Sequence, residues 1–295
     1  VYHAELWGKR GEKLAWLDAT PFESVQWKPL APNAPQFFLV PRDNALEEEY
    51  KQGFDVSKLF PQSGLGICAK RNEIAFKATR EELLEVVRDF ATMTEVELKN
   101  KYPRERKESR DRKTRYAIED IKSSGTDERR IVESLYRLFD FRWTYYSGKS
   151  KGFLAFPTYD TLKHLLRPNL SLILCRRVTS SPFRHAFVTD KITEMNSLSL
   201  QTGEQSFVYP LYVYPDSNDL LGGVAGRKPN LDAGIVAKFA EVVGLTFTAE
   251  KEDTPGTFAP VDILHYVYAI LYSPSYRERY NEFLKMDFPR VPFPE

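Results

Sequence analysis

Residues 139–153 read FDFRWTYYSGKSKGF and hold six aromatic side chains, one arginine and two lysines in fifteen positions. Aromatic and polar residues alternate along FDFRWTYY, which is the period of a β-strand with one buried face. SGKSK is a glycine-containing connection of hairpin length, and GFLAFP follows it as a second strand. The stretch therefore predicts a β-hairpin whose aromatic side chains pack in a core and whose lysines stand at the turn.

Strand patterns surround this hairpin. NLSLILCRRV and HAFVTD are further strands, and QSFVYPLYVYP is another in which Pro210 indicates an edge or a bulge. GLGICAKRNEIAF indicates a strand pair that turns near Arg71 and Asn72. These strands are expected to form a mixed sheet.

Helical patterns alternate with the strands. REELLEVVRDFATM carries Leu83, Leu84, Val87 and Phe90 on one side of an amphipathic helix, and TYDTLKHLL and LDAGIVAKFAEVVG are helical as well. The tail from Asp262 predicts two aromatic-rich helices broken at Ser273-Pro274, then an extended proline-rich end. The fold class is therefore mixed α and β (α+β), with a mixed sheet, flanking helices, a C-terminal helical pair and an extended tail.

Composition and charge exclude only a few classes of function. The chain has 295 residues with 42 Lys and Arg against 41 Asp and Glu, so any basic footprint for an anionic partner must be local. Cys68 and Cys175 lie in apolar strand patterns, where small buried residues are expected rather than a bridge. No apolar run could span a bilayer, and no secretory signal is present in these residues. The chain does not begin with Met and is expected to be a piece of a longer polypeptide.

Catalytic motifs are scarce. Neither GLG at 64–66 nor GGVAG at 222–226 completes a nucleotide-binding loop, and His3, His164, His185 and His265 lack metal-ligand spacing. Two nuclease-like sets occur, Asp43 with Glu49 and Lys51, and Asp89 with Glu97 and Lys99, but both fall on helical stretches. The basic segment 99–115 predicts either a solvated stretch laced with opposite charges or a phosphate-contacting arm.

Basic and polar residues that suit DNA gather in the second half. Arg forks match guanine edges, whereas Lys and Ser reach phosphate oxygens. The candidates for DNA contact are Lys149, Lys151, Arg176, Arg177, Ser180, Ser181, Arg184 and His185. Arg142 belongs to the same neighbourhood, but between Phe141 and Trp143 it could equally stack in the core.

The segments FDFRWTYYSGKSKGF, NLSLILCRRV, HAFVTDKI, FVYPLYVYP and the tail DILHYVYAILYSPSYRERYNEFLKMDFPRVPFP together resemble the C-terminal specificity region of type ISP and type IIG restriction–modification polypeptides. In such polypeptides a nuclease, an adenine-N6 methyltransferase and a target-recognition domain share one chain. The resemblance implies that residues 1–30 are the C-terminal edge of a methyltransferase domain with a linker rich in proline. It implies that residues 31–295 are a DNA target-recognition domain, with possible lobes 31–125 and 126–295.

The same resemblance implies the partners. These are double-stranded DNA and the methyltransferase domain of the same polypeptide, in the prokaryotic cytoplasm and without a membrane. The motifs that bind S-adenosylmethionine and grip adenine are absent here. The resemblance therefore implies no cofactor or metal in this piece, and S-adenosylmethionine and Mg²⁺ in the parent. Two alternatives stay open: a protein-interaction scaffold that orients the methyltransferase without reading DNA, and a hydrolase with an unrecognised site.

Overall fold

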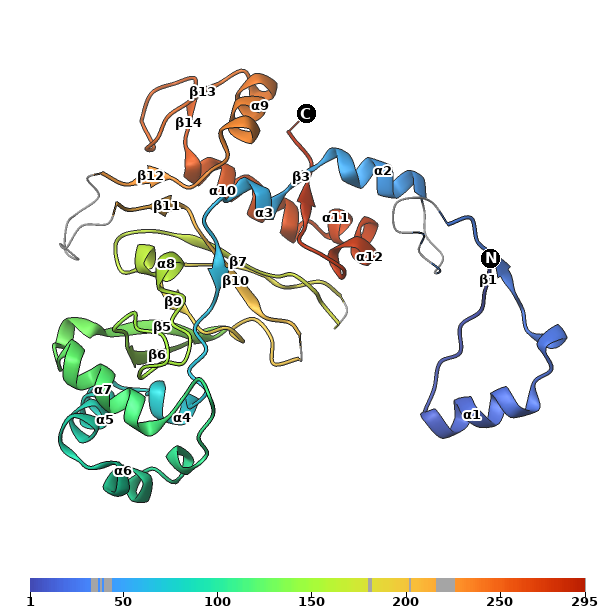
Figure 1. Cartoon of the computed structure of the whole chain (residues 1–295). Coiled ribbons are helices and arrows are strands. Elements are labelled where there is room, and N and C mark those ends of the chain that lie inside the picture. Colours follow the sequence, from blue (N-terminus) through green and yellow to red (C-terminus); the bar gives the residue numbers. More distant parts are fainter. Residues whose placement is uncertain are drawn as a thin grey trace. The chain divides into compact units, whose positions relative to one another are not determined.

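The computed structural model describes residues 1–32, 37, 39, 44–179, 182–201, 203–215 and 226–294 (Figure 1). Contacts along the chain separate two compact units, Val1–Lys51 and Gln52–Glu295. Ser180, Ser181, Asp43, Pro35 and most of the 222–226 loop lie outside the described residues.

The first unit has little core of its own. Its elements are the antiparallel strands β1 (Tyr2–His3) and β2 (Lys28–Pro29), the helix α1 (Arg10–Ala19), the 3-10 helix η1 (Phe22–Ser24) and most of α2 (Asn44–Gln52). No residue among 1–32 is buried, and Trp7, Leu17 and Phe22 are 84, 61 and 69% exposed. This unit therefore presents apolar side chains that it does not cover itself.

Two sheets organise the second unit. The four-stranded antiparallel sheet runs in the order β4 (Gly64–Leu65), β10 (Ser206–Pro210), β7 (Ser171–Cys175) and β8 (Ala186–Thr189). The three-stranded sheet has β5 (Ile131–Arg137) at its centre, antiparallel to β6 (Asp140–Tyr145) and parallel to β9 (Ile192–Thr193). The second sheet is mixed, as the sequence predicts.

Three strand pairs complete the sheets. They are β3 (Phe54–Asp55) with β15 (Arg290–Val291), β11 (Tyr212–Val213) with β12 (Lys228–Pro229), and the parallel pair β13 (Thr246–Phe247) with β14 (Thr257–Phe258). Pro210 is the last residue of β10 and pairs with Ser171, while β4 reaches only Phe207 and Val208. The proline therefore stands where one side of the strand is already unpaired.

A helical group covers the β5–β6 hairpin. It consists of α4 (Asn72–Ala75), α5 (Arg80–Thr92), α6 (Glu95–Lys101), η2 (Pro103–Arg106), α7 (Thr114–Ser124) and η3 (Glu128–Arg130). α5 begins as its sequence predicts, because Thr79 and Glu82 cap each other's backbone N–H groups at 3.2 and 3.3 Å. Leu83, Val87 and Phe90 are buried and Leu84 is half-buried, which confirms the predicted apolar side.

Further helices include α3 (Val56–Leu59), α8 (Tyr159–Leu162), η4 (Lys163–Leu165) and α9 (Ala233–Val243). The tail contains α10 (Pro260–Tyr272), α11 (Pro274–Arg279) and α12 (Asn281–Leu284). Ser273 caps α11 by accepting the Tyr276 N–H at 3.4 Å, with Pro274 in the first turn as predicted. The second predicted helix of the tail is thus two short helices, and the extended end returns as β15 to pair with β3.

Two predicted strand pairs are wrong. The hairpin around residue 140 joins β5 to β6 through a turn at 138–139, and residues 152–155 form no strand, because β6 already finds its partner in β5. SGKSK therefore leaves the hairpin instead of closing it. After Leu65 the expected second strand is the one-turn helix α4, which begins directly after Arg71.

Candidate functional site

The candidate arginines stand on the connection between β7 and β8, residues 176–185, which we call the Arg loop. Arg176, Arg177 and Arg184 are exposed. Arg176 Nε donates to Asp287 Oδ1 at 2.9 Å, and this hydrogen bond raises the pKa of Arg176 further above its ordinary value. Its guanidinium also lies 6.0 Å from the centre of the Phe288 ring. The arginine is therefore oriented by contacts while most of its surface stays accessible.

The base of the Arg loop is built on a buried carboxylate, Glu204. Its Oε1 accepts the N–H of Thr179 at 2.5 Å and the hydroxyl of Thr179 at 2.6 Å. Its Oε2 accepts the hydroxyl of Ser199 at 2.6 Å and lies 3.1 Å from His185 Nε2. Glu204 is fully buried. A buried carboxylate needs such donors, and here they connect Thr179 in the loop and His185 at its end to one side chain.

His185 differs from the expected DNA-contacting side chain. It is buried, with 8% of its surface exposed, and its ring is turned toward Glu204. Burial lowers the pKa of His185, while the neighbouring Glu204 acts in the opposite direction. This histidine therefore positions the loop from inside.

A hollow of about 400 Å³ adjoins the exposed end of the loop. Phe183 and Arg184 line it from the loop, and Tyr272, Arg277 and Asn281 line it from the tail helices. Arg277 Nε donates to the Leu271 carbonyl at 2.5 Å, and its guanidinium lies 4.3 Å from the Tyr272 ring. Among the described residues its buried Nη2 atom has no hydrogen-bond partner. Arg277 adds a cation beside Arg184 that sequence reasoning missed, because only the fold brings the tail helix to this loop.

The candidate lysines stand on residues 147–151, which we call the Lys loop. Lys149 and Lys151 are both exposed, and Lys149 Nζ donates to Ser123 Oγ on α7 at 2.8 Å. The backbone N–H of Lys151 donates to Ala155 at 2.9 Å, and this residue has a φ of +57°. The lysine side chains are therefore accessible on a loop whose backbone is held in place.

Asp120 of α7 holds the Lys loop together. Its Oδ2 accepts the Ser147 hydroxyl at 2.8 Å and the Phe153 N–H at 2.9 Å, and its Oδ1 accepts the Ser124 hydroxyl at 2.9 Å. Asp120 is buried, and a Cβ at Gly152 would lie 2.2 Å from its Oδ2. Glycine is required there because the backbone passes so close to the carboxylate.

The structure does not gather the lysines and arginines into one cluster. The Lys loop is attached to α7, whereas Val178 of the Arg loop donates its N–H to Lys285 beside α12 at 3.0 Å. Figure 1 places α7 and the α11–α12 pair on either side of the four-stranded sheet. The two loops thus form two separate basic surfaces.

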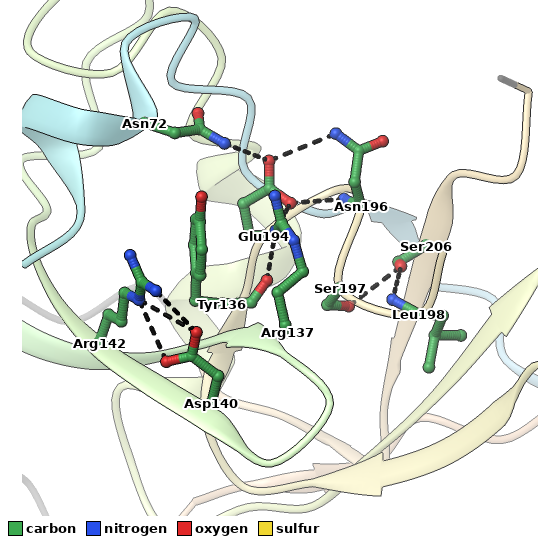
Figure 2. A network of polar contacts seen from close by, with 10 residues as sticks. All are labelled: Asn72, Tyr136, Arg137, Asp140, Arg142, Glu194, Asn196, Ser197, Leu198 and Ser206. Carbon is green, nitrogen blue, oxygen red and sulfur yellow. Dashed lines mark hydrogen bonds and ion pairs between the residues drawn. The ribbon is translucent and has the colours of Figure 1, made fainter. Parts of the chain in front are cut away.

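Between them lies the β5–β6 hairpin, where Arg142 stacks rather than entering the core. Figure 2 shows the Tyr136 ring between the guanidinium groups of Arg137 and Arg142, whose centres lie 4.0 and 4.1 Å from the ring centre. Arg142 also forms a forked pair with Asp140 at 2.9 and 3.1 Å. Arg137 Nη1 donates to the buried Glu194 at 2.6 Å. Both arginines are thereby neutralised and fixed within the protein.

The basic segment 99–115 is likewise laced with opposite charges. Lys99 pairs with Glu95 and Glu108, and Lys101 with Glu85 and Asp89. Arg112 forms a buried forked pair with Glu105 at 2.9 and 3.0 Å. These ion pairs within the protein favour the interpretation as a solvated stretch laced with opposite charges over a phosphate-contacting arm.

The other residues that were candidates for catalysis or metal binding do not come together in a site among the described residues. No group of three or more His, Cys, Asp or Glu residues in the described part of the chain could hold a metal ion. Asp89 accepts the Tyr102 hydroxyl at 2.5 Å, while Glu97 caps α6 and Lys99 pairs with Glu95, so this nuclease-like set is scattered. Burial raises the pKa of the Cys175 thiol to about 12, and the Cys68 pKa is raised for the same reason. No helix in the described residues has the length and apolar character to cross a membrane.

Comparison with known families adds a match over most of the chain. The model of the Type ISP C-terminal specificity domain matches residues 58–295. No curated protein matches significantly.

Solved structures are similar in fold. One is a cryo-EM structure of a DrdV–DNA complex, 24% identical over 97% of this chain, with a TM-score of 0.65. A nuclease-deletion mutant of the Type ISP restriction–modification enzyme LlaGI with a DNA substrate mimic is 18% identical over 96% of this chain, with a TM-score of 0.57. The ATP-dependent Type ISP enzyme LlaBIII bound to DNA is 17% identical over 92%, with a TM-score of 0.58. This chain spans 28, 25 and 17% of those three chains.

Proposed function

Since this chain belongs to the Type ISP C-terminal specificity domain family, we propose that it recognises a specific double-stranded DNA sequence for a restriction–modification polypeptide. Its recognition would position the target for an adenine-N6 methyltransferase and an endonuclease carried elsewhere in that polypeptide. A protein that reads base edges needs forked donors on a rigid support that can enter a groove. The observation that carries the proposal is the Arg loop, where exposed arginines stand on a hairpin braced by a buried carboxylate.

The residues of the Arg loop divide by their accessibility. Arg176, Arg177 and Arg184 are exposed and long enough to reach base edges, so we assign them to direct readout. Ser180 and Ser181, which lie outside the described residues, belong to the same proposal as phosphate contacts. We assign His185 to the support of the loop, because its ring is buried against Glu204.

The Lys loop suits a different role. Lys149 and Lys151 are compact point charges on an exposed loop, and such charges attract phosphates without reading sequence. Because the two basic surfaces are separate, the lysines would contact the duplex away from the bases that the arginines read. The Lys loop would thus add affinity, and the Arg loop would add specificity.

The first unit supports the proposed place of this chain in a larger protein. Trp7, Leu17 and Phe22 are exposed, and a neighbouring domain would remove them from water. We propose that residues 1–30 are the edge of the methyltransferase domain and its linker, and that residues 31–295 carry recognition, with lobes 31–125 and 126–295. S-adenosylmethionine and Mg²⁺ would be bound by the other domains, and the whole would act in a prokaryotic cytoplasm.

Selection from a random duplex library tests the function. The intact polypeptide is expected to enrich one sequence, and anisotropy titrations of the enriched and a scrambled duplex should differ in affinity. The log–log salt slope should fall by about 0.9 for each phosphate contact removed. The alternative role, a scaffold that orients the methyltransferase, predicts no enrichment and no salt-dependent duplex binding.

Variants of the Arg loop test the site. Arg176→Ala, Arg177→Ala and Arg184→Ala should each weaken binding to the selected duplex by about 1–3 kcal/mol and change the scrambled duplex much less. Lys58→Ala, which removes an exposed charge from α3, is the matched control and should leave the preference intact. If all three arginine variants kept the preference for the selected duplex, the Arg loop would not be the surface that reads the sequence.

A further inference from the structure

The turn of the β5–β6 hairpin contains an exposed aromatic residue in a costly backbone conformation. Leu138 and Phe139 form the two-residue turn, and Phe139 is 81% exposed with a φ of +61°. Glycine or asparagine ordinarily occupies such a position, because a bulky side chain makes the left-handed region unfavourable. An exposed aromatic ring is also unfavourable because its apolar surface stays in contact with water. The sequence thus places at this tip a residue that neither local conformation nor solvation favours, and such outliers gather at functional sites.

The tip is braced from both sides. β5 carries a register shift between Leu135 and Arg137, so Tyr136 lies at a bulge, and the two arginines of the stack described above hold its ring (Figure 2). Leu138 donates its N–H to the Ser197 carbonyl at 3.2 Å. Bulges of this kind redirect strand ends beside functional sites. Phe139 therefore projects from a support that resists being pushed back.

The tip also lies beside the Arg loop. The Phe139 and Phe187 rings meet edge to face, with their centres 5.5 Å apart. Phe187 stands on β8 only three residues after Arg184, which corresponds to about 10 Å along a strand. A duplex read by the arginines would therefore pass within reach of the Phe139 ring.

We propose that Phe139 is a wedge that inserts between two neighbouring base pairs of the bound duplex and unstacks that step. This inference rests on the proposed DNA-reading function and adds a means of deforming the target. Aromatic and aliphatic side chains at narrow protrusions act in this way, and the deformation contributes specificity at steps that open easily. Leu138 and Phe141 beside it are 39 and 43% exposed, so the Phe139 ring is the side chain that protrudes furthest from the two-residue turn. A narrow protrusion of this kind suits a gap between bases better than a protein partner, which would need a broader apolar surface.

The test uses 2-aminopurine, whose fluorescence rises on unstacking, placed at successive positions of the selected duplex. The intact polypeptide should raise the fluorescence at one step, and Phe139→Ala should abolish that rise. Phe139→Ala should also lower affinity for the matched duplex roughly tenfold, and much less for a duplex with a mismatch at that step, where stacking is already weakened. Phe139→Leu should restore both readouts in part. Val96→Ala, which shortens another exposed apolar side chain, 70% exposed on α6, should change neither.

The Phe139→Gly variant distinguishes the loss of the proposed wedge from a loss of folding. Glycine accepts the positive φ, so this variant should keep or raise the thermal midpoint while losing the fluorescence change. Equal loss of affinity for matched and mismatched duplexes, without a change at any probe position in the wild type, would overturn the wedge. If Arg176→Ala weakens binding and Phe139→Ala does not, the wedge alone is wrong. If the wild type binds no duplex, both the wedge and the proposed function are wrong.

Discussion

The Arg loop and the Lys loop are both held by a buried carboxylate, but they differ in where the hydrogen-bond donors to that carboxylate come from. Each is folded around a buried carboxylate, Glu204 in the first and Asp120 in the second. Glu204 is contacted by Thr179 and His185 of the loop and by Ser199. Asp120 accepts from Ser124 of its own helix, from Ser147 at the start of the Lys loop and from Phe153 just after it. The Arg loop is in addition tied to the tail, because Val178 donates its N–H to the Lys285 carbonyl and Arg176 pairs with Asp287.

The basic side chains of the two loops also differ in how firmly they are held. Arg176 is oriented by an ion pair with Asp287 and lies near an aromatic ring, while Lys149 is held by one serine hydroxyl. A planar fork with a fixed direction can select a base, whereas a flexible ammonium can follow any phosphate. The comparison shows that the basic side chains of the two loops differ in how firmly they are held, and the proposed division into a reading and an attracting surface rests on this difference.

The largest expected effect is on the brace of the Arg loop. Glu204→Ala leaves the Thr179 N–H and the Thr179 and Ser199 hydroxyls without their acceptor and should lower the free energy of unfolding by about 1–3 kcal/mol for each donor left unsatisfied, measured by denaturant titration. Glu204→Gln keeps the shape and one acceptor oxygen and should lose markedly less. A loss within the range of ordinary surface changes, about 0.5 kcal/mol, would show that the loop does not depend on this carboxylate.

Next comes the division of roles between the loops. Combining Lys149→Ala with Lys151→Ala should weaken selected and scrambled duplexes alike and reduce the log–log salt slope by about 1.8, which is two phosphate contacts. Combining Arg176→Ala with Arg184→Ala should instead remove about 1–3 kcal/mol of preference per arginine. Anisotropy at two salt concentrations measures both. If the lysine pair changed the preference and the arginine pair only the slope, the assignment of the two loops would have to be exchanged.

A glycine tests the brace of the Lys loop. Gly152→Ala places a methyl group against Asp120 and should cost about 1–3 kcal/mol of stability by overpacking, measured by thermal and denaturant unfolding. Gly11→Ala is the matched control, because nothing lies within 4 Å of an added Cβ there. If both variants unfold like the wild type, the Lys loop can move away from Asp120 without cost.

The smallest effect is on pH dependence. Burial lowers the pKa of His185 below its ordinary 6.5, so the folded chain binds fewer protons than the unfolded chain. The free energy of unfolding should therefore fall as pH drops below the ordinary histidine value, and the loss should be complete below the lowered value. His185→Gln should remove the part of the profile that begins as pH drops below about 6.5, leaving the carboxylate contribution. An identical profile in the variant would mean that Glu204 cancels the effect of burial.

Local patterns predicted much of the fold. The apolar side of α5 follows from a period of 3.6 residues, and the Ser273 cap of α11 follows from its turn chemistry. The strands β7, β8 and β10 follow from short apolar runs, and β7 is buried along its whole length. The sequence also places Arg176, Arg177 and Arg184 at strand ends, where exposed loop residues are expected. It went wrong at 152–155 and after Arg71, because pairing partners are chosen by the whole sheet and not by the strand itself.

The sequence by itself determined most of the helices and strands, the family resemblance and the set of candidate residues proposed for contact with DNA. The tertiary structure alone decided which buried carboxylate supports which loop. The hydrogen bonds that do so join residues 25 and 33 positions apart, as in Thr179 with Glu204 and Phe153 with Asp120. It also decided that His185 turns inward and that Phe139 stands exposed beside the Arg loop. Side-chain period is a local property of the backbone, whereas a buried charge takes its partners from whatever segments the packed core brings to it.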